Sequence, residues 1–371
     1  MKKFTSESQY INAMTANSDT QLKHLYFWGR PLSPLYSCLM ANRSSFYQKG
    51  LFKQHKLEVP VISVGNLVLG GTGKTPLVHY IAQLLHQKEH KPAILSRGYK
   101  GTATGKINVV SDTTAILLEA DQAGDEPRLL AEKLPGIPVI TGKKRSVTGR
   151  FAIDTYGVDS LILDDGFQHL SLKRDINLVL FSAQKLLGNS RVLPGGDLRE
   201  PLSALKRADA FIISGLDDPA DVNVRGFIKF LHNLFPDKPV FTGSYLPEET
   251  IIRTHAGKND TLGLSEARKI PVYGFCGIAQ PESFQRMLKK SHMNLSGFQS
   301  FEDHHIYSLN DIKSLHNNGL LSGAQGLITT EKDLVKIRGL FPRDFPLLTL
   351  PIRFQMDNDF DQFLLNKLES F

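Results

Sequence analysis

The chain has 371 residues, which is long enough for two packed α/β domains, and its 41% hydrophobic and 22% charged residues are ordinary for a soluble globular protein. The formal net charge of +7 suits an anionic partner such as a nucleotide, a nucleic acid, a phospholipid surface or an acidic glycolipid. Two cysteines exclude a disulfide framework and favour a reducing cytoplasm, and no apolar run reaches the roughly 18 to 20 residues of a spanning helix or forms the core of a signal peptide.

The first segment, residues 1–57, is basic and aromatic. No acidic residue lies between Asp19 and Glu58, and Pro31 and Pro34 divide the segment into two predicted helical pieces. Apolar and aromatic residues alternate there with six basic ones: Lys23, Arg30, Arg43, Lys49, Lys53 and Lys56. This pattern is typical of an interfacial helix on an anionic leaflet, and equally of a docking helix with a solvated basic face. A nucleic-acid surface is a third option, without a supporting motif.

A glycine-rich loop follows the predicted strand Val59–Val64 and precedes an apolar-periodic helix. Strand, glycine loop, Lys-Thr and helix are the layout of a phosphate-binding loop. Lys74 would reach the β- and γ-phosphates, and the Thr75 hydroxyl would contact Mg²⁺. The standard pattern places its first glycine at Val68, so the loop is a variant, and a glycine turn with a chance lysine is the alternative. The predicted ATP-binding residues are Gly70, Gly71, Thr72, Gly73, Lys74 and Thr75.

Strands and helices then alternate, which predicts a mainly parallel α/β sheet flanked by helices, like that of a P-loop kinase. The expected strands are 91–96, 137–141, 160–163, 176–181, 210–213 and 240–245, and the expected helices 126–133, 144–156 and 227–235. A second alternation predicts a smaller α/β domain, with strands 270–275, 325–329 and 346–354 and helices 281–291, 309–317 and 331–340. We expect a nucleotide-binding domain at 58–245, joined by 355–371 with its final helix 360–368, and a smaller domain at 246–354, the polar stretch 240–268 containing the boundary.

Two pairs of acidic residues lie where a kinase would need them. Asp164 and Asp165 end an apolar strand, as a Mg²⁺-binding aspartate would, although an Asp-Gly turn explains them too. Asp125 and Glu126 open a helix, where they could cap it or supply a general base and a metal contact. Because ligands of such sheets bind at the carboxyl ends of strands, we expect these motifs to converge.

Other polar residues are candidates for the acceptor. Arg97 closes a strand, Gln168 could orient a phosphate or water, and Arg191 and Arg199 offer planar forks in the loop 188–201. In Phe301–His305 the adjacent histidines argue against zinc, and one of them could tune a carboxylate base, although a surface loop is as good an interpretation.

Together these motifs resemble the tetraacyldisaccharide 4′-kinases, the lipid A 4′-kinases of Gram-negative bacteria. The matching segments are 30–36, 64–66, 70–76, 96–99, 124–127, 164–169, 188–201, 275–278, 281–284, 303–305 and 329–333. The loop 188–201 departs from the family pattern, with Gly-Asn-Ser-Arg and Pro-Gly-Gly-Asp where Gly-Asn-Gly-Arg and Pro-Ala-Gly-Pro are usual. The first 20 residues lie outside the resemblance.

The resemblance implies transfer of the γ-phosphoryl group of ATP to the 4′-hydroxyl of an acylated glucosamine disaccharide 1-phosphate, at the cytoplasmic face of the inner membrane. It implies two domains joined by two strands, for which 240–245 and 348–354 are candidates. Asp125 would be the base and His304 its partner from the other domain, so that domain closure would complete the site. Thr75, Glu126, Asp164 and Asp165 would serve Mg²⁺. Tentative acceptor-binding residues are Asn66, Arg97, Gln168, Asn189, Arg191 and Arg199.

Two rival functions stay open at this point. A GTPase-like switch would need an Asn-Lys-x-Asp motif, and the only Asn-Lys, Asn366-Lys367, is followed by Leu-Glu. A nucleic-acid-dependent ATPase would use the basic segment 1–57. We expect the glycolipid and the anionic membrane surface as partners, no nucleic acid, and no obligate protein partner.

Overall fold

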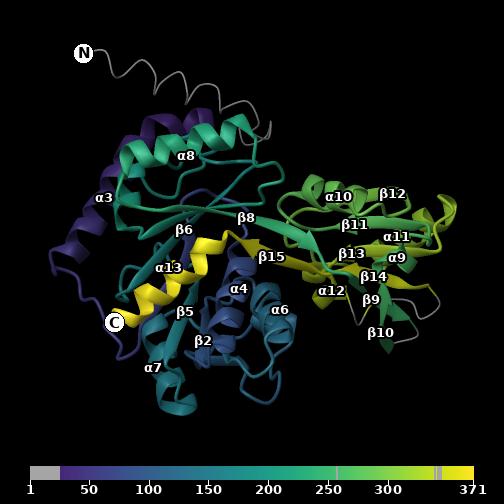
Figure 1. The fold of residues 1–371 in the computed structure, drawn as a ribbon, viewed down its shortest axis with the longest axis horizontal. Coiled ribbons are helices and arrows are strands. Elements are labelled where there is room, and N and C mark those ends of the chain that lie inside the picture. The colour runs from purple at the N-terminus through teal and green to yellow at the C-terminus, as the bar shows by residue number, and fades with distance from the viewer. Residues whose placement is uncertain (1–25, 256–257, 338–339, 341–344) are drawn as a thin grey trace. The chain divides into compact units, whose positions relative to one another are not determined.

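The structure is a computed structural model that describes residues 26–255, 258–337, 340 and 345–371. The chain packs into two units, each with a sheet and a core of its own (Figure 1). The first unit holds the described residues up to Arg97, together with Gly142–Ser244 and Gln355–Phe371. The second unit holds Gly98–Thr141 and Tyr245–Phe354.

A parallel sheet forms the centre of the first unit. Its strands are β1 (Val61–Asn66), β2 (Pro92–Ser96), β5 (Ser160–Asp164), β6 (Ile176–Ser182), β7 (Ala210–Ser214) and β8 (Val240–Pro247), in the order β8-β7-β6-β1-β5-β2. Nearly every residue of β1, β5, β6 and β7 is buried, as expected for strands covered on both faces. The sheet continues from β1 to β5 on one side and to β6 on the other. In open α/β sheets, ligands bind in the crevice at the carboxyl ends of the strands where the order reverses in this way.

Helices cover this sheet because each presents one apolar face. Helix α4 (Lys74–Gln87) packs against β1, β2 and β5, and α8 (Val222–Leu234) places Phe227 in a cluster with Phe181 and Phe211. The other helices of the unit are η1 (Arg30–Leu32), α3 (Ser33–Gln48), α7 (Arg145–Tyr156), η2 (Leu202–Arg207) and α13 (Asn358–Glu369). Helix α13 completes the core late in the chain, because Phe360 is fully buried against Tyr80 and Phe241.

The second unit contains a six-stranded mixed sheet. Its strands are β9 (Thr250–His255), β10 (Lys258–Gly263), β11 (Val272–Cys276), β12 (Leu295–Ser300), β13 (Gly326–Thr330) and β14 (Leu347–Leu350), in the order β10-β9-β14-β13-β11-β12. Helix α10 (Pro281–Lys290) packs in one apolar cluster of this sheet, and α11 (Leu309–Leu321) and α12 (Glu331–Ile337) pack in the other (Figure 1). The remaining elements are β3 (Asn108–Ser111), α5 (Ala120–Ala123), α6 (Asp125–Lys133), β4 (Val139–Thr141), α9 (Leu264–Ala267) and β15 (Ile352–Met356), the last crossing into the first unit.

The predicted fold class is confirmed, and the strands and helices named from the sequence are present with ends shifted by a few residues. The domain boundaries remain a prediction, and the packing of the chain differs from it in one respect. The chain passes between the units after Arg97, Thr141, Ser244 and Phe354, so residues 98–141 group with the second unit.

Two local regions show detail that the sequence did not predict. The polar stretch 240–268 contains the change of unit after Ser244, and it also contains the antiparallel hairpin of β9 and β10. The predicted strand 346–354 is two strands, separated at Pro351. Pro31 lies in η1 and Pro34 in the first turn of α3, where proline is tolerated, and η1 separates the helical residues 26–29 from α3, so the chain is divided into two helical pieces here as predicted. The part of the basic segment before residue 26, including Lys23, lies outside the described residues.

Among the residues that the structure describes, none of the helices has the length and apolar character needed to cross a bilayer.

Candidate functional site

The glycine loop leaves β1 at Asn66 and ends at α4, whose first residue is Lys74. Gly70 and Gly73 have φ angles of 106° and 80°, a region that side chains disfavour, so glycine is required at both turns. The first-turn N–H groups of α4 have no side-chain cap, and a helix start with free N–H groups is a ready anion site. Residues 70–75 therefore form a glycine turn that leads directly into the N-terminus of α4, and binding of ATP by these residues stays a prediction.

Asp164 and Asp165 follow β5, the strand that pairs with β1, and they have different surroundings. Asp164 is buried beside Val64 and accepts a hydrogen bond from Ser96 Oγ at 3.5 Å. Asp165 adopts a φ of 54°, and its carboxylate lies 3.7 Å from Lys74 Nζ. Burial raises the pKa of the Asp165 carboxyl, but Lys74 and Arg199 lower it by more, so the net shift is downward.

Arg199, a tentative acceptor-binding residue, is engaged with this aspartate. Its Nη1 donates to both carboxylate oxygens of Asp165, at 3.0 and 2.9 Å. Gln168 donates to Asn66 O at 3.0 Å, and Asn66 Nδ2 donates to Val68 O at 2.6 Å, so these two residues support the start of the loop. The Asn189 side-chain oxygen accepts from the backbone of Arg191 and of Asp197, which folds the loop 188–201 on itself. Binding of the acceptor by these residues stays a prediction.

Further residues that the sequence analysis missed support the glycine loop. Ser214, at the end of β7, donates to Thr72 O at 2.6 Å. Lys185 Nζ donates to Leu69 O at 3.0 Å and to Asp197 Oδ1 at 3.2 Å. Arg145, at the start of α7, is buried, and its charge acts on both Asp164 and Asp165. Only Arg145 had a visible signal, since it ends a Lys-Lys-Arg run at a predicted helix start.

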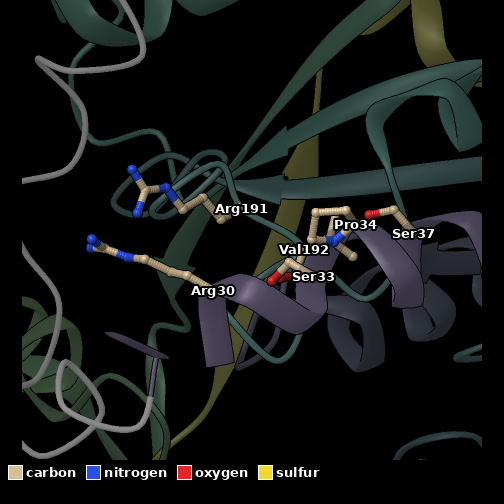
Figure 2. A pocket seen from close by; sticks show the side chains of 6 residues that line it. All are labelled: Arg30, Ser33, Pro34, Ser37, Arg191 and Val192. Carbon is tan, nitrogen blue, oxygen red and sulfur yellow. The ribbon is translucent and has the colours of Figure 1, made fainter. Parts of the chain in front are cut away.

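A basic pocket lies between α3 and the loop 188–201 in the first unit. It has a volume of about 460 Å³ and is lined by Arg30, Ser33, Pro34, Ser37, Arg191 and Val192. Figure 2 shows that the guanidinium groups of Arg30 and Arg191 extend in the same direction. The Arg30 guanidinium carbon lies 5.5 Å from the ring centroid of Phe27, and guanidinium groups such as these two can bind an anion through paired N–H donors. Ser33 connects α3 to the loop 188–201, since its hydroxyl donates to Val192 O at 2.8 Å and accepts from Gly195 N at 2.9 Å.

Large apolar side chains are exposed on and around α3. They are Phe27, Trp28, Leu32, Leu35, Leu39, Phe46, Leu51 and Phe52, each at least 40% exposed. Helix α3 has basic neighbours but no acidic residue along its length. An exposed apolar surface flanked by basic residues indicates a binding surface for a partner that has both apolar and negatively charged groups.

Asp125 and His304 form a hydrogen-bonded pair in the second unit. His304 Nδ1 lies 2.9 Å from Asp125 Oδ2 and 3.2 Å from Oδ1. Asp125 is the first residue of α6, after Gly124 at φ 92°, and His304 has a φ of 60°. The sequence analysis placed the two residues in different domains that would close on each other. In the structure residues 98–141 pack with the second unit, so the pair forms within one unit, and the closure of two domains on each other stays a prediction.

The Asp125 carboxyl is buried but remains charged. Burial raises its pKa, while the hydrogen bond with His304 and the charge of Lys332 lower it by more, so that the pKa falls to about 2. A buried carboxylate with one strong hydrogen bond is ionised at neutral pH and oriented by its partner. The pair can therefore accept a proton from a hydroxyl group.

Lys332 links the pair to the predicted metal ligand Glu126. Its Nζ lies 3.3 Å from His304 Nε2, 3.2 Å from Asp303 Oδ1 and 3.4 Å from Glu126 Oε1. Because an ammonium group only donates, it favours a lone pair on His304 Nε2 and hence a proton on Nδ1. The sequence analysis assigned no role to Lys332.

The predicted metal ligands divide between the units. Thr75, Asp164 and Asp165 belong to the first unit and Glu126 to the second. Arg97 is exposed at the end of the first unit's stretch of chain.

The fit of Mg²⁺ to this site is judged from the side chains that could bind it. No group of three or more His, Cys, Asp or Glu side chains among the described residues forms a metal cage. Mg²⁺ in nucleotide sites uses one or two protein oxygens besides phosphates and water, so a Thr75 hydroxyl and an Asp164 carboxylate fit. Asp165 fits less well, because Lys74 and Arg199 already neutralise its charge.

Comparisons with known proteins identify the family of this chain. The sequence profile of the LpxK family, tetraacyldisaccharide-1-P 4′-kinase, matches residues 25–369. A tetraacyldisaccharide 4′-kinase from Desulfotalea psychrophila is 45% identical over 94% of this chain and 98% of its own length. One from Syntrophus aciditrophicus is 38% identical over 88% and 89%. A crystal structure of LpxK from Aquifex aeolicus in complex with ATP superposes with a TM-score of 0.71, at 31% identity, and covers 91% of this chain and 98% of that one.

Proposed function

Since the chain belongs to the tetraacyldisaccharide-1-P 4′-kinase family, we propose that it transfers the γ-phosphoryl group of ATP to the 4′-hydroxyl of a tetraacylated glucosamine disaccharide 1-phosphate. The observation that carries this proposal is the match to the family over residues 25–369, and it is supported by a glycine loop that turns at Gly70 and Gly73 and leads into α4 at Lys74. The reaction belongs to lipid A biosynthesis.

The glycine loop would hold the triphosphate. Backbone N–H groups of residues 70–73 and the start of α4 would bind phosphate oxygens, and Lys74 would contact the β- and γ-phosphates. An arriving phosphate would compete with the Asp165 carboxylate for Lys74, which lies 3.7 Å from it. Positioning and charge neutralisation are most of what phosphoryl transfer needs from a protein.

Thr75 and Asp164 would hold Mg²⁺, with Glu126 as a further candidate on the second unit. Held by these residues, Mg²⁺ would supply positive charge that offsets the negative charge of the phosphate groups. Asp165 would act instead through its ion pairs with Lys74 and Arg199, by keeping both cations in place.

Asp125 would be the general base. Its carboxylate would accept the proton of the acceptor hydroxyl, and His304 Nδ1 would orient the carboxylate through the 2.9 Å hydrogen bond. Proton removal makes the hydroxyl oxygen a better nucleophile for the γ-phosphorus. Lys332, through His304 Nε2, would help to keep the imidazole in the Nδ1–H form.

The acceptor and the membrane would meet the first unit near α3. Arg30 and Arg191 suit the 1-phosphate of the glycolipid, because two guanidinium forks can bind one phosphate group. The exposed apolar side chains around α3 suit acyl chains and an anionic leaflet, which supports a peripheral position on the cytoplasmic face of the inner membrane.

The proposal is tested by incubating the purified chain with γ-labelled ATP, Mg²⁺ and the acylated disaccharide 1-phosphate. We expect label in the 4′-phosphate of the glycolipid, and none when Lys74→Ala replaces the natural chain. Hydrolysis of ATP that responds to DNA or RNA, with no labelled glycolipid, would support the nucleic-acid-dependent ATPase instead.

A further inference from the structure

The residue before the glycines of the nucleotide loop is fixed through both of its backbone polar groups. Leu69 N donates to Asp197 O at 2.8 Å, and Leu69 O accepts from Lys185 Nζ at 3.0 Å. Both partners come from the segment after β6, more than 100 residues along the chain. Leu69 is therefore bound to a neighbouring segment immediately before the backbone turns at Gly70.

Asp197 anchors this arrangement. Its side chain is buried, and it accepts three hydrogen bonds, from Tyr26 Oη at 2.9 Å, Lys185 Nζ at 3.2 Å and Asn189 N at 3.2 Å. A buried carboxylate without its charged partner destabilises the folded chain, so Asp197 and Lys185 each hold the other in position. The carboxylate also carries the contact from Tyr26, at the beginning of the described chain, to the loop 188–201.

Gly70 itself imposes little order. Its φ of 106° is accessible to glycine, and a Cβ there would meet one heavy atom within 4 Å, Lys185 Nζ at 3.9 Å. Without Lys185 the loop would have an open side at this residue and a free carbonyl at Leu69. A flexible glycine loop must lose conformational entropy when it closes on phosphates, and a fixed first residue lowers that cost.

We propose that Lys185 is a positioning residue for the nucleotide, anchored by Asp197, that presets the start of the glycine loop for the phosphates of ATP. The proposal rests on the proposed function of the glycine loop. It assigns Lys185 no contact with the nucleotide, since its ammonium group is already shared between Leu69 O and Asp197.

The test uses the full chain and compares Lys185→Met, Lys185→Arg and Asp197→Asn with the natural sequence. Lys88→Met is the matched control, because Lys88 is an exposed lysine of the same unit beyond the end of α4. The dissociation constant of a non-hydrolysable ATP analogue is measured by calorimetry, and KM is measured for ATP and for the acceptor separately. Thermal unfolding of each variant is recorded alongside.

We expect Lys185→Met to weaken binding of the analogue and to raise KM for ATP by about three- to tenfold, the effect of one lost hydrogen bond of ordinary strength, with KM for the acceptor unchanged. Lys185→Arg should restore part of the affinity, and Asp197→Asn should add little to Lys185→Met in the double variant. The control should bind like the natural chain.

Two results would overturn the inference. One is unchanged nucleotide affinity in both Lys185→Met and Asp197→Asn, with only a lower unfolding temperature. The other is an equal rise of KM for ATP and for the acceptor, which would indicate general damage. Lys74→Ala separates these from failure of the proposed function: if that variant also binds the analogue normally, the glycine loop is not the nucleotide site.

Discussion

Replacing Asp125 by Asn tests the proposed base most directly. Asn keeps the shape of the side chain and can still accept a hydrogen bond from His304, but it cannot take a proton. General bases contribute about 10²- to 10⁴-fold to rate, or about 3–5 kcal/mol of barrier, so kcat should fall by that factor. KM for ATP should stay nearly constant, because Asp125 belongs to the second unit and the glycine loop to the first.

The assay is single-turnover transfer of labelled phosphate to the glycolipid at saturating ATP. Asp121→Asn is the matched control, an exposed aspartate in α5 of the same unit, and it should react at the natural rate. A kcat within about threefold of the natural value in Asp125→Asn would refute the assignment, since such a change is far below the contribution of a general base.

The Asp125→Asn substitution should also lower the free energy of unfolding. The pKa of Asp125 is lowered from its ordinary 3.8 to about 2, which corresponds to about 2 kcal/mol of unfolding free energy. Because the folded-state pKa is depressed, this contribution is fully present above pH 4 and is lost as the pH falls through 2. The stability difference between the natural chain and Asp125→Asn should thus shrink by about half at pH 3. A difference that does not depend on pH between 3 and 7 would contradict the assigned electrostatics.

Three further predictions follow from the site. In His304→Ala, Asp125 loses the hydrogen bond that orients its carboxylate, so kcat should fall by about 10- to 100-fold. Because that hydrogen bond lowers the pKa of Asp125, its loss should raise this pKa and move the acid limb of the pH–rate profile to higher pH. An unchanged acid limb would contradict this role. Arg30→Gln with Arg191→Gln should raise KM for the acceptor by about tenfold or more and leave KM for ATP unchanged, measured by initial rates; equal KM values for the acceptor would remove the phosphate assignment. Leu35→Ser with Leu39→Ser should weaken partitioning onto phosphatidylglycerol vesicles by about tenfold in co-sedimentation, whereas the exposed Leu321→Ser of the second unit should not; equal partitioning of both variants would reject α3 as the membrane-facing element.

Local sequence patterns predicted the elements that carry the site. The strand, glycine and lysine pattern predicted the loop between β1 and α4, because each residue type there has a local conformational reason. The carboxylates after β5 were equally visible, since parallel strands bring their carboxyl ends together. Asp125 and His304 were paired through the family resemblance, and no local pattern relates residues 179 positions apart.

What the sequence did not reveal depends on distant contacts or on sheet edges. Lys185 and Lys332 are single lysines whose partners lie far along the chain, so no local spacing marks them. The hairpin of β9 and β10 lies at the edge of its sheet and carries polar residues, as edge strands do, so its sequence indicated a domain boundary and not a hairpin. The grouping of residues 98–141 with the second unit is likewise a property of long-range packing.

The role of α13 in the first unit has a consequence for biosynthesis. Phe360 fills a core position beside Tyr80, and Tyr80 Oη donates to Asp361 at 2.7 Å, so these hydrogen-bonded partners lie 281 positions apart in the chain. A ribosome releases the N-terminal strands of that core long before it has made the helix that seals it. The core of the first unit therefore remains incomplete in the nascent chain until α13 has been translated. We expect nascent chains to depend on chaperones until then.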